Sequence, residues 1–149
     1  MLFGKRQDMS KSAGEGTTAR QDYRFWTEEK LRNTDTDKQG HVNNGVMSCF
    51  FEAGRIELLA AAEIAAIRAL TSIVVVRMLI NFKKELFFPG KVGVGTRVVR
   101  VGRTSIEFLQ AIHAANGEVA NAEATCVLLD RATRKPAPVP QQLRTYLMG

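Results

Sequence analysis

One polar segment, residues 33–44 (NTDTDKQGHVNN), combines side chains that can do chemistry with the start of a helix. It contains two carboxylates, Asp35 and Asp37, and lies between a strand-like stretch and a helical one. The first turn of a helix has unpaired backbone N–H groups and the positive end of the helix dipole, which stabilise a developing oxyanion. A carboxylate beside them can attack a carbonyl or activate water. The segment therefore predicts acyl transfer or ester hydrolysis; the alternative is a polar loop followed by a helix cap.

Other catalytic and metal-binding motifs are absent from the sequence. It has no G-x-S-x-G, Walker A or C-x-x-C pattern, and its histidines and cysteines lack zinc-site spacing. Residues 35–40 imitate the opening of a calcium loop, but Gln39 occupies the fifth position and Val46 the twelfth, where a bidentate Glu is required. We therefore expect neither a metal ion nor another cofactor.

The composition is that of one ordinary globular domain. The chain has 149 residues, of which 45% are hydrophobic and 24% charged, and no apolar run is long enough to span a bilayer. Its net charge of +6 comes from the two ends, residues 1–20 and 131–149, while the body between them is neutral. A neutral body argues against nucleic-acid binding, although the basic tails keep that alternative open. Two cysteines and no signal-like leader predict small, buried, reduced thiols and a cytoplasmic location.

The elements that must position the polar segment follow from the hydrophobic periodicity. Residues 23–31 are strand-like, and apolar positions spaced three or four apart predict a long helix over residues 44–68. Gly54 falls on the apolar face of that helix, so we expect a neighbour to pack very close to it. Further strands are predicted over residues 73–86, 91–101, 105–114 and 118–129. The expected fold is α+β, an antiparallel sheet wrapped around one long helix. We expect one domain over residues 21–135, between a flexible basic leader (1–20) and a C-terminal tail (136–149).

Several sequence patterns resemble those of a known enzyme family. The run D-T-D-x-x-G-H-V-N-N, followed by F-E-x-x-R in the helix, is similar to the 4-hydroxybenzoyl-CoA thioesterase-like branch of the hotdog-fold acyl-CoA thioesterases. Within that branch it most resembles the bacterial long-chain acyl-CoA thioesterase type. The stretches F-K-K-E-L-x-x-P-G and V-G-R-T-S-I-E-F also match, so the resemblance covers residues 22–133. It implies the hotdog fold, a five-stranded antiparallel sheet wrapped around one long central helix, and hydrolysis of an acyl-CoA thioester.

The resemblance also implies roles for five residues. Asp37 would be the catalytic carboxylate, acting as general base or nucleophile, and the backbone N–H of Asn44 would donate to the oxyanion. His41 and Asn43 would line the substrate pocket or position water; alternatively, Asn43 only caps the helix and His41 only packs the loop. Met47 stands where the family usually has an aromatic residue, so we expect it to form a softer pocket wall.

The same resemblance implies partners. The substrate would be an acyl-CoA, and the protein a homodimer or homotetramer with its active site at the subunit interface; no membrane or nucleic-acid partner is expected. Candidates for binding the CoA phosphates are Lys83, Lys84, Arg100 and Arg103, and Asp35 is expected to bond the loop backbone. One alternative is a non-catalytic acyl-CoA-binding protein of the same fold. A hydratase or dehydratase is disfavoured, because its His-plus-acid pattern is absent.

Overall fold

The structure, a computed structural model, describes residues 20–149, which form an α+β fold around one antiparallel sheet. The sheet has five strands in the order β1-β3-β4-β5-β2. Its strands are β1 (Phe25–Lys30), β2 (Thr71–Phe82), β3 (Lys91–Val101), β4 (Ser105–Ala114) and β5 (Gly117–Asp130). The predicted fold class and all five strands are confirmed, although β2 ends four residues earlier than expected. The predicted leader, residues 1–20, lies outside the described residues except for Arg20.

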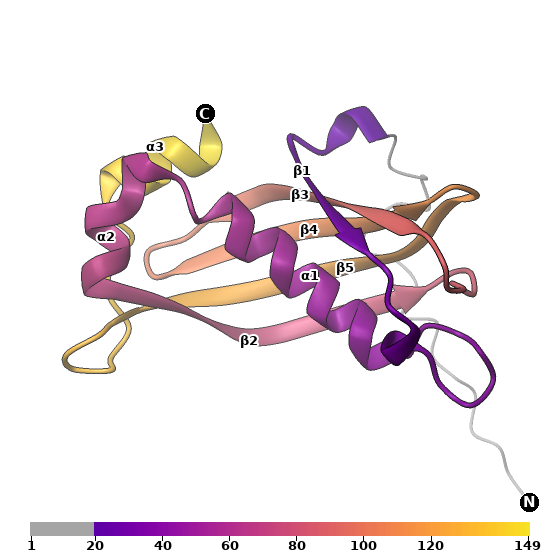
Figure 1. Ribbon diagram of the computed structural model, residues 1–149. Coiled ribbons are helices and arrows are strands. Elements are labelled where there is room, and N and C mark those ends of the chain that lie inside the picture. Colours follow the sequence, from indigo (N-terminus) through magenta and orange to yellow (C-terminus); the bar gives the residue numbers. More distant parts are fainter. Residues whose placement is uncertain (1–19) are drawn as a thin grey trace, which may run out of the picture.

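Helix α1 (Asn44–Leu58) lies across one face of the sheet, with the loop of residues 33–43 at one end (Figure 1). The prediction of one helix over residues 44–68 is wrong. The chain leaves the helix after Leu58, makes a turn, and continues as a short 3-10 segment (Ala62–Ile64) and helix α2 (Ala65–Leu70). The break allows Ile64 to be buried at the end of the sheet, where it is 1% exposed.

Two apolar clusters form the core: the first lies between α1 and the sheet, and the second lies between the sheet, the segment around Ile64 and the C-terminal residues. One includes Phe51 and Ile112, and the other includes Phe108 and Leu128. On β4 the buried Gln110 lies between Phe108 and Ile112, so a polar side chain separates the clusters. A side chain at Gly54 would collide with this region: a Cβ there would lie 2.8 Å from the hydroxyl oxygen of Thr96 and 3.0 Å from Nε2 of Gln110. The close approach expected at Gly54 is therefore confirmed.

The C-terminal segment contains an element that the sequence analysis did not predict. Helix α3 (Gln141–Met148) packs against the end of the sheet near α2, and its Leu143 and Leu147 are buried in the second cluster (Figure 1). The tail of residues 136–149 thus contributes to the core.

The two cysteines differ in exposure. Cys126 is buried, as expected, but Cys49 is exposed on α1, so the expectation that both are buried is wrong for Cys49. Among the helices of residues 20–149, none is both long and apolar enough to cross a membrane.

Candidate functional site

Asp35 organises the loop that precedes α1. Its side chain is 3% exposed, and its Oδ2 accepts a hydrogen bond from the backbone N–H of Arg32 at 2.8 Å. The Arg32 guanidinium lies 3.1 Å from the other carboxylate oxygen. The backbone carbonyl of Asp35 accepts from the N–H of Asn43 at 2.8 Å, which ties the start of the loop to the start of the helix. The expected structural role of Asp35 is confirmed.

Asp37 lies at the exposed turn of the same loop. Its Oδ1 accepts hydrogen bonds from the backbone N–H groups of Gln39, at 2.8 Å, and His41, at 3.2 Å. Its own N–H donates to the carbonyl of His41 at 2.8 Å. These bonds fix the carboxylate against the loop while Oδ2 has no hydrogen-bond partner among residues 20–149. The second oxygen is therefore available to a substrate or a water molecule.

The N-terminus of α1 has one unused backbone donor. The side chain of Asn43 caps the helix by accepting from the N–H of Gly45 at 2.8 Å, and its carbonyl accepts from the N–H groups of Val46 and Met47. Within the described part of the chain, the N–H of Asn44 has no acceptor. This donor carries the partial positive charge of the helix end and can hold an anionic oxygen. Asn43 is the helix cap, one of the two alternatives open for it.

A cleft of about 250 Å³ adjoins this donor. His41, Asn44 and Met47 line it, so the structure brings together three of the five predicted site residues; Asp37 and Asn43 are not among the lining residues. The imidazole of His41 packs edge-on against Phe87, and its Nε2 lies 3.4 Å from Oε1 of Glu85.

The second wall of the cleft is residues 82–86, the last residue of β2 and the segment that follows it. Sequence analysis singled out only Lys83 and Lys84 in it, and assigned no role to Phe82, Glu85 or Leu86. A hydrogen bond from the N–H of Val42 to the carbonyl of Leu86, at 2.7 Å, joins the two walls. This pairing is between segments far apart in the sequence, so no local pattern could have predicted it.

The four candidate phosphate-binding residues are divided between the two ends of the sheet. Lys83 and Lys84 line the cleft. Arg100 and Arg103 lie at the β3–β4 hairpin, at the opposite end from the 33–43 loop (Figure 1). Arg100 is also paired with Glu107 at 3.0 Å. Only the two lysines are placed where they could contact a ligand in the cleft.

A second and larger cavity, of about 330 Å³, lies at the far end of α1. Its walls are mostly apolar, and Arg68 and Arg131 are the charged residues among them. None of the predicted site residues lines it. In residues 20–149, no group of three or more His, Cys, Asp or Glu side chains could hold a metal ion.

The model of one protein family, the thioesterase-like superfamily, matches residues 31–147 of the chain. The search of curated proteins found no match to this chain.

Several solved structures have the same fold. The PA5185 protein of Pseudomonas aeruginosa PAO1 is 26% identical, with a TM-score of 0.79 over 87% of this chain and 92% of that one. A protein described as a predicted thioesterase from Bacillus stearothermophilus is 28% identical, with a TM-score of 0.75 over 83% and 93% of the two chains. A thioesterase from Thermus thermophilus, solved with coenzyme A and Zn, is 26% identical, with a TM-score of 0.76 over 85% and 99%.

Proposed function

This chain belongs to the thioesterase-like superfamily, and we propose that it hydrolyses the thioester of an acyl-CoA to a free acid and coenzyme A. The observation that carries the proposal is the unused N–H of Asn44, a residue that lines a cleft beside the carboxylate-bearing loop. The solved Thermus thermophilus thioesterase that contains coenzyme A supports the same class of substrate.

In the proposed reaction the thioester carbonyl lies at the N-terminus of α1. The N–H of Asn44 donates to the carbonyl oxygen as it becomes an oxyanion, and the helix dipole adds to this stabilisation. Asp37 either removes a proton from an attacking water or attacks the carbonyl carbon itself, giving an anhydride that water then hydrolyses. In both routes the C–S bond breaks, the sulfur leaves as the CoA thiolate, and the acyl group ends as the acid.

The other predicted residues have supporting roles in this proposal. His41 and Met47 form walls of the cleft, Met47 on the side of the apolar core. Asn43 acts on the substrate indirectly, because its side chain takes the N–H of Gly45 and so leaves the N–H of Asn44 as the free donor.

We also propose that two copies associate along β2, as a dimer or as the basis of a tetramer. β2 is an edge strand, and an unpaired edge is a template for a second strand. Its exposed apolar side chains are Val75, Val76, Leu79 and Phe82. Antiparallel pairing of two β2 strands places the start of one beside the end of the other. The apolar cavity near Thr71 of one copy then adjoins the cleft near Phe82 of its partner.

The proposed compartment is the cytoplasm. Both Cys49 and Cys126 are free thiols, which is typical of proteins in reducing compartments.

The test is thiol release from a panel of short, long and aromatic acyl-CoAs, with the wild type compared with Asp37→Asn. We expect turnover to fall by about 100-fold or more in the variant, the effect typical of losing a positioned base or nucleophile. Asp22→Asn is the matched control, because Asp22 is an exposed aspartate on another segment, and it should retain full activity.

The other outcomes are equally informative. Full activity in Asp37→Asn would mean that another residue activates the nucleophile. No turnover of any acyl-CoA by the folded wild type would reject the enzyme, and coenzyme A binding measured by calorimetry would then test the non-catalytic acyl-CoA-binding alternative.

A further inference from the structure

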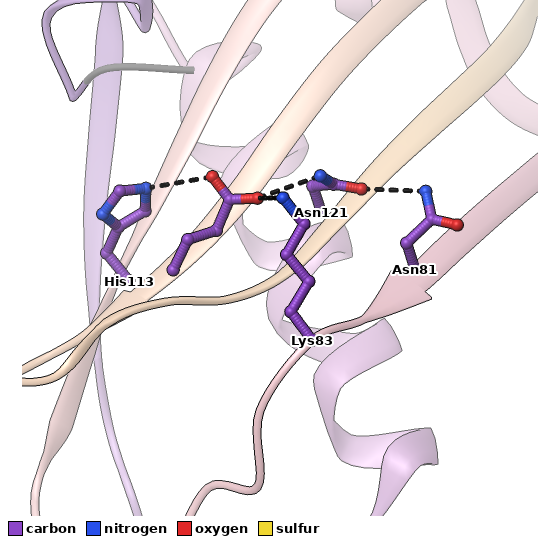
Figure 2. Close-up of polar contacts among 5 residues, drawn as sticks. Asn81, Lys83, His113 and Asn121 are labelled. Carbon is purple, nitrogen blue, oxygen red and sulfur yellow. Dashed lines mark hydrogen bonds and ion pairs between the residues drawn. The ribbon is translucent and has the colours of Figure 1, made fainter. Parts of the chain in front are cut away.

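A polar cluster lies next to the cleft, and a buried carboxylate is at its centre. Glu118, near the start of β5, has a side chain that is only 3% exposed. Its Oε1 lies 2.7 Å from Nζ of Lys83 and accepts a hydrogen bond from Nδ2 of Asn121 at 2.9 Å. The Nδ2 of Asn81 in turn donates to Oδ1 of Asn121. Figure 2 shows Lys83, Asn121 and His113 converging from different strands and the segment after β2.

The pairing of this carboxylate is incomplete. Nε2 of His113 lies 3.6 Å from Oε2 of Glu118, and within residues 20–149 neither of these buried atoms has a hydrogen-bond partner. Burying a charge is costly unless it is paired and fully hydrogen-bonded. A buried ion pair such as this one is therefore weak evidence for a role in stability. Among residues 20–149, Lys83 is the lysine or arginine that pairs with Glu118, and loss of Lys83 leaves the buried carboxylate uncompensated.

Lys83 connects the cluster to the cleft. It is the first residue after β2, and it lines the cleft with Lys84 and Glu85. The backbone N–H groups of Lys83 and Lys84 both donate to the carbonyl of Val119, at 2.8 and 3.1 Å, directly next to Glu118. The strand exit is thus held to β5 by two backbone bonds and one ion pair.

The contacts continue from this segment to the loop that bears Asp37. Glu85 lies against His41, and the carbonyl of Leu86 accepts from Val42. His41 in turn exchanges backbone contacts with Asp37. A continuous set of contacts therefore runs from the buried carboxylate to the catalytic loop.

We propose that Glu118 is a positioning residue of the thioester site: through its ion pair with Lys83 it fixes residues 83–86 of the second wall of the cleft. This inference rests on the proposed function, because it assigns that wall to substrate binding. The ion pair also holds the Lys83 ammonium on the side of Glu118, while the Lys84 ammonium donates to the carbonyl of Asn116 at 2.6 Å.

The test uses Glu118→Gln and Lys83→Met, which keep the side-chain length and remove the charge, together with the double variant. A wall that contacts the substrate equally in the ground and transition states affects KM more than kcat. We expect KM to rise by about tenfold in each single variant with kcat nearly unchanged, and the double variant to be no worse than either, because the two residues act as one pair. Lys83→Arg preserves the ion pair, so its KM should stay close to that of the wild type.

The matched control is Glu107→Gln. Glu107 pairs with Arg100 at 3.0 Å on the same sheet, away from the cleft. The Glu107→Gln substitution should leave KM unchanged. A merely structural role for Glu118 would lower the melting temperature and leave KM at the wild-type value, and that result would overturn the proposal.

A second measurement does not depend on turnover. Amide hydrogen exchange should become faster in residues 83–86 and 41–44 of Glu118→Gln and Lys83→Met, but not of Glu107→Gln. If the wild type hydrolyses no acyl-CoA, the proposed function fails while this comparison still decides whether Glu118 holds the cleft wall. Unchanged exchange in Glu118→Gln, which leaves the partly exposed Lys83 ammonium rather than a buried carboxylate without its partner, would refute the inference.

Discussion

Replacing Gln110 by Met removes the polar contacts between α1 and the centre of the sheet. Gln110 is 1% exposed, and its Oε1 accepts a hydrogen bond from NH1 of Arg55 at 2.7 Å. Its Nε2 donates to the carbonyl of Phe51 at 2.8 Å and to the hydroxyl of Thr96 at 2.9 Å. Met has a similar length and no hydrogen-bonding group of comparable strength, so the space stays filled while three buried groups lose their partner.

The expected cost follows from what each group loses. Leaving a buried neutral group unsatisfied costs about 1 kcal/mol at the lower end, and losing a bond to a charged group costs about 2 kcal/mol. The guanidinium of Arg55 is buried, and this desolvation lowers its pKa, so it has little water to replace Gln110. The Thr96 hydroxyl can rotate and the Phe51 carbonyl also belongs to the helix, which reduces their share. We therefore expect a destabilisation of about 3 kcal/mol, or a melting temperature about 6–12 °C lower for a chain of this size.

The measurement is urea unfolding followed by circular dichroism, with the melting temperature as a second readout. The slope of the free energy with urea should stay unchanged, so that the shift in midpoint reports stability alone. Glu107→Gln, at a half-buried position of the same strand, should change stability by less than about 0.5 kcal/mol. A decrease of less than about 1 kcal/mol in the free energy of unfolding of Gln110→Met would refute the reasoning. It would mean that a thioether stabilises this site as well as the buried hydrogen bonds do.

Four further results are expected. Asn43→Ala should lower stability by about 1 kcal/mol, because the cap to the N–H of Gly45 is lost, and unchanged urea unfolding would contradict that role. Burial lowers the pKa of His113 below its ordinary value of 6.5, so the unfolded chain binds the proton more readily. The free energy of unfolding should be highest above about pH 7 and should fall as the pH drops through 6.5. Unfolding midpoints measured at pH 7.5 and 5.5 should differ less in His113→Gln than in the wild type. Burial raises the pKa of the Cys126 thiol, and a thiol-specific reagent should modify it only after denaturation; labelling in the native protein would disprove its burial. Val76→Lys, at the exposed middle of β2, should convert the proposed β2 dimer to a monomer in light scattering and abolish turnover, and a mass equal to that of the wild type would reject association along β2.

Local patterns predicted the fold well because most of its elements are fixed by local chemistry. Ala115 and Asn116 form the two-residue turn between β4 and β5, and two-residue alternation marks the strands on either side of it. The break after Leu58 was missed because the apolar spacing continues through residues 59–68, and only burial of Ile64 at the sheet end requires the chain to turn. Helix α3 was missed because it has only eight residues, too few to show a helical period, and follows a proline-rich stretch.

The candidate site was predictable to the same extent. Asp37, Asn43 and Asn44 are close in the sequence, so the loop, the cap and the free helix donor could be inferred together. The second wall of the cleft could not, because residues 82–86 meet His41 only through the pairing of distant segments. Chemistry carried by one segment is visible in a sequence, whereas a cleft between two segments depends on the whole topology.

The position of Glu118 shows why even a correct strand prediction can hide a residue that we propose to position the cleft. Strict alternation along β5 assigns Glu118 to the same face as Ala120 and Ala122, which lie against α1 in the apolar core. The register between β4 and β5 shifts after Ile112, which pairs with Ala120, while His113 pairs with Glu118. This bulge inserts one extra residue into β5, so the residues of β5 that precede it point to the opposite face of the sheet from the one that strict alternation predicts. Glu118 therefore joins Asn121, three residues away, on the outer face of the sheet and can reach Lys83. A single irregular residue in a strand thus converts a charge expected in the apolar core into the anchor proposed for the cleft wall.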